Sequence, residues 1–501
     1  MLAFVLALVG LKLVMGARLD LIRDEAYYAL WALHPLQAGY YDHPPAVVWF
    51  IKAGRALVGD FELGARLVAI VSVGIVSLAI HRTAMALLGD HRVAALSVYW
   101  FNLTPGGMLG LFVITPDAPS MLFWALALWA AAELQAARDG RWWLAFGLFA
   151  GLGLASKYTG LFLGAGIALW LLAHRENRRW FASAYLYAGG ALALAIFAPV
   201  IAWNLDNGLS SFAFQFGRAG AVDLSLRDLL HLPEFVAAQA GLLLPWLFAL
   251  VVAGLAIFPT SANWRGDARL GLLIWTGVPA LAYFLFHGLH ATVQGNWPWP
   301  LYAQLSVLGA QMALAWKPGG RWLTLVQRQA LIWQAPVGVA VGALIFAQAS
   351  TQFVRLPFLD QTRVAHGWPA VARDVDALVA ETGIETILVD DYGLVGWLSV
   401  YGAKMDADYR VLPLGEFHRY GFIDLPVSDA ALQWPVLLAL PAGISAGGVD
   451  APARHPEPLM RLGETATFVA RIVRQGADAT PAGAIDIYRL ERPRMPVFGS
   501  D

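Results

Sequence analysis

Long apolar runs recur along the first 350 residues of the chain. A helix needs about 20 mostly apolar residues to cross ~30 Å of hydrocarbon, and eleven segments approach that length. These predicted spans are residues 2–17, 66–88, 93–112, 118–134, 142–156, 160–173, 183–203, 237–258, 269–287, 298–316 and 330–349. Further helices could lie within residues 40–65 and 204–236. The pattern therefore predicts a polytopic α-helical membrane protein with about 11–13 transmembrane helices.

Lys and Arg residues are distributed unevenly between alternate loops. One set of loops contains twelve of them, whereas the opposite set contains only Lys157, Arg218 and Arg227. Cytoplasmic loops carry the excess of positive residues, so the first set faces the cytoplasm. The other loops, and everything after the last span, then face the far side. In a bacterial inner membrane that side is the periplasm.

The sequence changes character after residue 350. Of the 69 Asp, Glu, Lys and Arg residues, 32 lie in the last 151 positions, which indicates a soluble domain. Short strand-like runs at Thr386 to Val389, Pro435 to Ala439, Thr467 to Val473 and Ala484 to Leu490 alternate with helix-like stretches such as Trp368 to Glu381. We expect a transmembrane domain at residues 1–350 with a periplasmic loop at 18–65, followed by a periplasmic α/β domain at 351–501.

Composition excludes several classes of protein. With 58% hydrophobic and 14% charged residues, the chain is not a soluble enzyme. Its net charge of -1 provides no basic excess for a nucleic-acid partner. With no cysteine it has no disulfide, thiolate metal site or cysteine nucleophile. The 21 Trp and 15 Tyr suit the interfaces of a bilayer, where membrane lipids are the surrounding partners.

Two acidic residues lie on the predicted periplasmic side, each at the start of a predicted helix. In a helix from Asp24 to Trp31, Asp24 shares a face with Tyr27 and Tyr28, whereas Glu25 points about 100° away. Asp117 lies at the mouth of the span that begins at residue 118. Either aspartate could simply cap its helix. Ionisable groups at membrane depth are costly and tend to be functional, so together they could supply a base and a cation site.

Lys157 interrupts an apolar stretch from Trp142 to Ala173. Its side chain could snorkel towards water, or its ammonium could bind an anion such as a lipid phosphate. A nucleotide P-loop is excluded here, because that motif needs Gly immediately before the Lys and Ser or Thr after it, and Ser156 and Tyr158 flank this one.

Two further predicted periplasmic loops combine aromatic rings with hydrogen-bonding side chains, a combination that can bind sugars or lipid headgroups. An aromatic belt at the membrane interface is the alternative explanation for any single Trp. The residues are Trp203, Asn204 and Arg218 in one loop, and His287, His290, Gln294, Asn296 and Trp297 in the other.

Several of these segments occur in the order found in a known family. They are "DEAYYALW" from Asp24, "YYDHPP" from Tyr40, "TPDAP" from Thr115, "SKYTG" from Ser156, "WN" at Trp203 and "GNWPWPLY" from Gly295. The chain resembles the GT-C class of polytopic glycosyltransferases, in particular the superfamily of lipid A aminoarabinose transferases and protein O-mannosyltransferases.

The resemblance implies a GT-C fold and a sugar donor linked to polyprenyl phosphate, used on the periplasmic side in an inverting transfer. The family's first-loop aspartate corresponds to Asp24, its second-loop acid to Asp117 and its juxtamembrane acid to Asp42. The chain has His43 where some relatives have a lysine, so a phosphate contact or a metal-binding role at that position stays open. A divalent metal could bind Asp24, Asp117 or His43, and no nucleotide cofactor is needed.

These considerations predict a glycosyltransferase that moves a sugar from polyprenyl phosphate to lipid A, core oligosaccharide, or another periplasmic glycan or protein. We expect Asp24, Asp117 and the adjacent Glu25 to be catalytic, and Lys157, His43 and Arg218 to contact the donor phosphate. The expected substrate-binding residues are Tyr27, Tyr28, Tyr41, Asp42, Tyr158, Trp203, Asn204, His290, Asn296 and Trp297. A transporter or flippase for lipid-linked sugars, or a ligase that transfers a whole glycan, remains an alternative.

Overall fold

A computed structural model of the chain describes residues 1–59, 61–217, 230–317, 320–354, 360–426, 428, 431–442, 444–445, 448–449, 466–492 and 497–498. The chain forms two compact units. The first comprises Met1–Leu13, Asp42–Phe50 and Arg66–Leu344. The second comprises Val14–Tyr41, Ile51–Ala65 and Ile345–Asp501.

Helices make up most of the chain. Up to residue 217 they are α1 (Leu2–Arg18), α2 (Arg23–Trp31), α3 (Ala46–Val58), α4 (Phe61–Leu88), α5 (His91–Leu103), α6 (Pro105–Gly110), α7 (Asp117–Ala137), α8 (Trp142–Leu154), α9 (Gly160–Ala173), η1 (Arg175–Ala182), α10 (Ala184–Asp206) and α11 (Ser210–Gly217). The later helices are α12 (His231–Leu243), α13 (Pro245–Ile257), α14 (Ala262–Gly266), α15 (Ala268–Trp275), α16 (Val278–His287), η3 (Trp299–Leu301), α17 (Tyr302–Leu314), α18 (Arg321–Thr351), η4 (Gln361–Ala365), α19 (Trp368–Thr382), α20 (Tyr392–Lys404) and η5 (Phe417–Tyr420).

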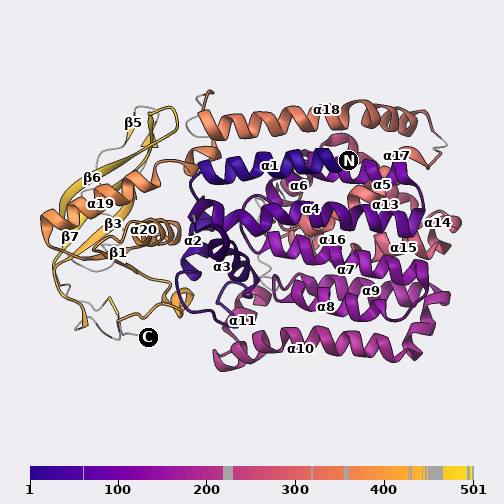
Figure 1. Ribbon diagram of the computed structural model, residues 1–501, viewed down its shortest axis with the longest axis horizontal. Helices are drawn as coiled ribbons and strands as arrows, with labels where there is room; N and C mark the ends of the chain where they lie inside the picture. The colour runs from indigo at the N-terminus through magenta and orange to yellow at the C-terminus, as the bar shows by residue number, and fades with distance from the viewer. Residues whose placement is uncertain are drawn as a thin grey trace. The chain divides into compact units, whose positions relative to one another are not determined.

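The first unit is a helical bundle. Helices α7, α8 and α10 run side by side in it (Figure 1). Glycines allow the closest approach, because a Cβ atom on Gly147 of α8 would lie only 2.1 Å from the carbonyl oxygen of Gly189 on α10. Small residues at such crossings are typical of helices that pack within a membrane.

Each of the eleven predicted spans coincides with helical structure, but three are interrupted. The span predicted at 269–287 contains a short turn between α15 and α16. The span predicted at 93–112 divides at Thr104, whose hydroxyl accepts a hydrogen bond from Gly107 N at the start of α6. The span predicted at 237–258 divides before Pro245, where α12 and α13 meet at 114°. Proline cannot donate the backbone hydrogen bond that would continue the helix.

Among the described residues, five helices are long and apolar enough to cross a membrane, and the number rises to seven if each bent pair of helices is one span. Helices α8 and α9 are apolar but shorter. The chain is therefore a multi-pass membrane protein, and the larger number of about 11–13 spans stays a prediction.

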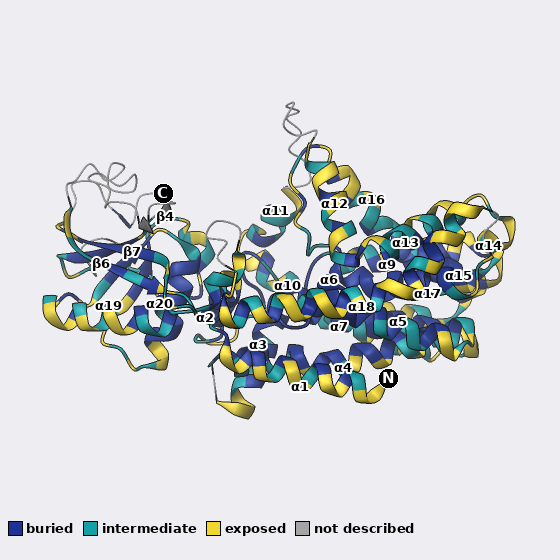
Figure 2. Cartoon of the chain, turned by 90° about the horizontal axis from the view of Figure 1, so that it is seen from above, coloured by how far each residue is buried: buried dark blue, intermediate teal, exposed yellow. Residues whose placement is uncertain are grey.

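Exposed positions on the first unit are strongly apolar. On α1, Leu2 and Leu6 are 70% and 60% exposed, and Leu194 on α10 is 59% exposed. Exposed turns of α1 and α10 appear in yellow in Figure 2. Leucine side chains on such a surface suit contact with lipid tails rather than water.

The second unit contains a five-stranded sheet in the order β2-β1-β3-β7-β6. The strands are β1 (Thr386–Val389), β2 (Arg410–Pro413), β3 (Val436–Ala442), β6 (Thr467–Gln475) and β7 (Pro481–Leu490), and a separate pair consists of β4 (Ile444–Ser445) and β5 (Gly448–Val449). Strand β1 is parallel to β2 and β3, whereas β7 is antiparallel to β3 and β6. Helix α19 packs on α20 and β6, as expected for an α/β layer. The four predicted strands and the predicted helix at 368–381 are confirmed.

The division into units differs from the predicted one. Residues Val14–Tyr41 and Ile51–Ala65 group with the C-terminal residues, although the predicted periplasmic loop 18–65 was assigned to the transmembrane domain. Hydrogen bonds explain the difference: Leu21 N donates to the Tyr401 hydroxyl at 2.9 Å, and Trp397 Nε1 donates to Leu21 O at 2.7 Å. Helix α2 thus packs on α20, more than 360 positions later.

Candidate active site

The first unit contains a buried ion pair between Asp117 and Lys157. Asp117 is the first residue of α7, and Lys157 lies in the turn between α8 and α9. Lys157 Nζ is 2.6 Å from Asp117 Oδ1, and Asn296 Nδ2 donates to Asp117 Oδ2 at 2.7 Å. Three segments predicted to carry site residues therefore meet at one carboxylate.

Two alternative interpretations are wrong: that Asp117 caps its helix, and that the Lys157 side chain snorkels towards water. The N-cap position of α7 is Pro116, so Asp117 is not the cap, and its carboxylate binds side chains from other segments. Lys157 is 8% exposed and ion-paired rather than snorkelling towards water. Breaking such a buried pair leaves an uncompensated charge, which makes each partner dependent on the other.

The Asp117 carboxylate is buried and has three stabilising partners. Asp117 is only 2% exposed, so desolvation works against its charge. The ammonium of Lys157, the amide donor of Asn296 and the N-terminus of the 21-residue helix α7 all oppose that penalty. The cluster thus pairs one carboxylate with one ammonium.

The loop that carries Asn296 also carries a cluster of aromatic rings. The Trp297 ring lies 5.5 Å from the His287 ring, and His287 lies 4.9 Å from His290. His290 is 7% exposed. The structure thus brings the predicted residues Asn296, Trp297 and His290 together in the first unit, with Asn296 contacting the carboxylate directly.

Tyr158 and Asn204 belong to a different, structural cluster. The Tyr158 hydroxyl is 2.8 Å from Ser211 Oγ and accepts from Asn204 Nδ2 at 3.4 Å. Asn204 Oδ1 accepts a hydrogen bond from Phe212 N at 3.1 Å, which links α11 to α10. Both residues are buried, whereas the neighbouring Trp203 is half-buried. Their polar groups are used within the protein, and their predicted role in substrate binding stays a prediction.

The segment before α3 approaches the turn that carries Lys157. Ala46 N donates to Ala155 O at 3.0 Å, two residues before the lysine. Gln215 Nε2 donates to the backbone oxygen of Asp42 at 2.6 Å, and Asp42 is 5% exposed. The adjacent His43 is half-buried. Arg218, predicted to contact phosphate, lies outside the described residues.

The first-loop acids belong to the second unit. Asp24 is exposed, and its Oδ1 accepts a 2.8 Å hydrogen bond from the Tyr392 hydroxyl. The N-cap position of α2 is Ile22, so the interpretation of Asp24 as a cap is wrong. Glu25, three residues after the cap, is fully buried, and its Oε2 accepts from Ile22 N at 3.0 Å. Glu25 therefore has a capping role that its predicted catalytic role did not anticipate.

The predicted tyrosines of this segment are packed among other rings. Tyr27 and Tyr28 are buried and lie 5.5 Å apart between ring centroids. Tyr27 also lies 5.4 Å from Tyr392, and Tyr41 lies 4.3 Å from His418. Their rings help to fix α2 within the second unit.

The described residues present no donor set that fits a divalent metal. Both oxygens of Asp117 already accept from an ammonium and an amide, which are donors rather than metal ligands. No three His, Asp or Glu side chains gather as ligands among the described residues. The predicted metal dependence stays a prediction, and no step below depends on it.

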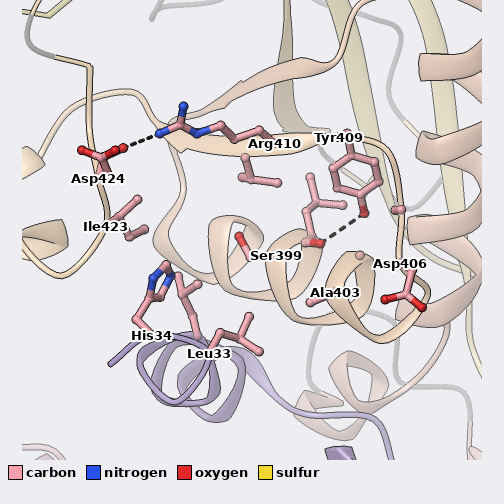
Figure 3. Close-up of a pocket in the computed structure, with 14 residues that line it drawn as sticks. Leu33, His34, Ser399, Ala403, Asp406, Tyr409, Arg410, Ile423 and Asp424 are labelled. Carbon is pink, nitrogen blue, oxygen red and sulfur yellow. Dashed lines mark hydrogen bonds between the residues drawn. The ribbon is translucent and has the colours of Figure 1, made fainter. Parts of the chain in front are cut away.

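The second unit also contains an open cavity of about 630 Å³ (Figure 3). Ligand pockets commonly measure roughly 300–1,000 Å³. The cavity lies beside the C-terminal end of α2, the opposite end from Asp24, and no predicted site residue lines it. Its labelled lining side chains are Leu33, His34, Ser399, Ala403, Asp406, Tyr409, Arg410, Ile423 and Asp424.

Two residues that contact Asp24 or its neighbour Arg23 are not predicted from the sequence. Tyr392 donates to Asp24, and Asp391 forms an ion pair with Arg23, the residue before Asp24. Both follow β1 at the start of α20, in the motif "DDYG". Acidic residues at a strand-to-helix junction normally indicate a helix cap, and nothing local relates them to residues 368 positions earlier.

Parts of the chain are similar to known proteins. A family model described as dolichyl-phosphate-mannose-protein mannosyltransferase matches residues 42–203. The lipid A galacturonosyltransferase RgtD of Rhizobium johnstonii (strain DSM 114642 / LMG 32736 / 3841) is 26% identical over 398 residues, covering 78% of this chain and 79% of that protein. A 104-residue stretch is 36% identical to the cytosine permease of Escherichia coli (strain K12), but it covers only 21% of this chain and 22% of the permease.

The fold is shared with a solved structure. The crystal structure of ArnT from Cupriavidus metallidurans bound to undecaprenyl phosphate superposes with a TM-score of 0.63 at 16% identity, and 97% of each chain is covered. At this identity the likeness shows the fold alone. The matched family model, the galacturonosyltransferase relative and the shared fold all indicate the GT-C superfamily of membrane glycosyltransferases.

Proposed function

We propose that the protein transfers a single sugar from a polyprenyl-phosphate donor to lipid A or a related glycan at the periplasmic face of a bacterial inner membrane. The buried Asp117–Lys157–Asn296 cluster carries this proposal, because a buried cation beside a carboxylate at the start of an apolar helix suits a lipid-borne phosphate. The name of the RgtD relative, a lipid A galacturonosyltransferase, supports the acceptor class. Undecaprenyl phosphate in the ArnT structure supports the donor class.

In this proposal Lys157 receives the phosphate. As the bond between the sugar C1 and the phosphate oxygen breaks, negative charge grows on the leaving polyprenyl phosphate. The Lys157 ammonium stabilises that charge, while Asp117 and Asn296 keep the lysine side chain in place. Lysine binds phosphate as a point charge, so sharing it between carboxylate and phosphate needs no rearrangement of the backbone.

Asp24 is the proposed general base. The acceptor hydroxyl attacks C1 from the face opposite the phosphate, which inverts the configuration, and its proton passes to the Asp24 carboxylate. Asp24 suits this role better than Glu25, because Asp24 is exposed whereas Glu25 is buried and caps α2. The base and the phosphate-binding cation are thus assigned to different residues with different surroundings.

The test is a transfer assay with purified full-length protein, lipid A as acceptor and a panel of polyprenyl-phosphate sugars. Mass spectrometry should detect one added sugar residue, or donor hydrolysis when the acceptor is omitted. Asp24→Asn and Lys157→Met should abolish transfer, whereas Lys317→Met, an exposed lysine outside the cluster, should behave as wild type. A product that gains a whole glycan would indicate a ligase instead. Movement of the lipid-linked sugar across vesicles without any transfer would indicate a flippase.

A further inference from the structure

Helix α2, which carries Asp24, packs closely against α20 within the second unit. A Cβ atom on Gly396 would lie 2.7 Å from the carbonyl carbon of Ala26, so the glycine allows the two backbones to meet. The hydrogen bonds from Leu21 N to Tyr401 and from Trp397 to Leu21 O fix the chain just before α2. The position of α2 therefore depends on residues of the C-terminal part of the chain.

The start of α20 faces the start of α2. Asp391 is the N-cap of α20, where its Oδ1 accepts from Leu394 N at 2.8 Å, and its Oδ2 pairs with the guanidinium of Arg23. The same guanidinium lies 4.3 Å from the centroid of the Tyr392 ring. Asp391 thus forms an ion pair with Arg23, the residue directly before Asp24 in the sequence.

Tyr392 contacts Asp24 itself. Its hydroxyl donates to Asp24 Oδ1 at 2.8 Å, and the described residues form no hydrogen bond to Asp24 Oδ2. Burial, and next the Asp24 carboxylate, raise the pKa of the Tyr392 hydroxyl, so it stays a donor at neutral pH. One carboxylate oxygen is oriented while the other remains open to accept a proton.

We infer that Tyr392 is a positioning residue for Asp24, and that Asp391 supports it by drawing Arg23 away from that carboxylate. A neutral donor orients a base without pairing its charge, whereas a guanidinium in the same place would form a bidentate ion pair and reduce its basicity. Helix α20 accordingly contributes to the chemistry through its contact with Asp24. This inference rests on the proposed role of Asp24 as the base.

The first test is Tyr392→Phe in the full-length enzyme. Loss of a hydrogen bond to a charged group should lower kcat at least about tenfold, while KM for donor and acceptor and the melting temperature stay unchanged. Tyr187→Phe is the matched control, because the Tyr187 hydroxyl also makes a 2.8 Å hydrogen bond, to Phe181 O on the first unit. An unchanged kcat in Tyr392→Phe, or a loss that comes with a lower melting temperature, would overturn the inference.

The second variant separates the charge of Asp391 from its capping role. Asp391→Ser retains a good N-cap for α20 but no longer pairs with Arg23. Arg23 can then turn to Asp24, so kcat should fall several-fold without loss of stability. Full activity in Asp391→Ser would contradict the supporting role assigned to Asp391.

A spectroscopic measurement distinguishes failure of this inference from failure of the proposed function. With 3-fluorotyrosine at position 392, Asp24→Asn should shift the fluorine resonance, and a probe at position 187 should not respond. This result does not depend on finding the correct donor. If no donor is used but the resonance shifts, the proposed function fails and the Tyr392–Asp24 contact stands. An unmoved resonance would disprove the contact itself.

Discussion

Lys157 Nζ lies 2.6 Å from Asp117 Oδ1, although the two residues are 40 positions apart in the sequence. The pair is buried at the junction of α7 with the α8–α9 turn, and Asn296 completes it from a third segment. A buried ion pair is weak evidence for stability alone, because well-packed apolar residues often replace such a pair without loss. We therefore expect the pair to serve the proposed transfer reaction rather than stability alone.

Replacing one or both residues of the Asp117–Lys157 pair should affect the stability of the protein and its transfer activity differently. Lys157→Met leaves Asp117 buried without its partner and should cost about 3 kcal/mol of stability. In the double variant Asp117→Asn with Lys157→Met no charge is buried at this site. The protein should therefore recover most of its stability but no transfer activity. Thermal unfolding in detergent and the transfer assay measure the two properties. A double variant that transfers sugar at the wild-type rate would show that the pair is only structural.

Asn296 should matter through its donor rather than its size. Asn296→Asp places a second carboxylate 2.7 Å from Asp117 Oδ2 and should destabilise the protein as well as abolish transfer. Asn296→Ala removes one hydrogen bond to a charged group. The transfer reaction should lose about 1.5–3 kcal/mol of transition-state stabilisation, which is a tenfold or larger fall in kcat/KM. Steady-state kinetics on both variants test this order, and equal activity of the two would contradict it.

Tyr158 directly follows Lys157 but should act mainly on stability. Its hydroxyl is used by Ser211 and Asn204 within the protein, so Tyr158→Phe should cost about 1 kcal/mol. KM for the donor should stay within twofold of wild type. The measurement is donor titration alongside thermal unfolding. A large increase in KM at unchanged stability would instead support the predicted role of Tyr158 in substrate binding.

Local patterns predicted most elements of the fold. The strand at Thr386 to Val389 and the helix that carries Asp24 were found because apolar runs and helical spacing depend only on neighbouring residues. Helix α20 and strand β2 were missed. Residues of α20 are buried around most of its circumference, so no amphipathic period marks it, and β2 has only four residues.

The partners within the site could not be predicted in the same way. Lys157 and Asp117 were both selected as functional, yet as separate groups, because no local rule relates residues 40 positions apart. The ordered motifs selected candidate residues but gave no indication that Tyr392 contacts Asp24, since Tyr392 lies outside every matching motif. Helical periodicity separated Asp24 from Glu25 correctly, and only the structure shows that Glu25 caps the helix.

Gly396 provides a test of the packing that places Asp24. In an exposed helix Gly→Ala would be stabilising, by about 1 kcal/mol. At Gly396 the added Cβ would lie 2.7 Å from Ala26 C and 2.8 Å from Tyr27 N, which are backbone atoms that cannot rotate away. Gly396→Ala should therefore push α2 from α20, cost about 1–3 kcal/mol and lower transfer.

Gly421→Ala is the matched control, because a Cβ at Gly421 meets nothing within 4 Å and the residue has right-handed helical backbone angles. Its stability should stay within about 0.5 kcal/mol of wild type. Thermal unfolding of both variants, with transfer measured in parallel, gives the comparison. If Gly396→Ala is as stable and active as Gly421→Ala, α2 does not pack on α20, and α20 does not position Asp24.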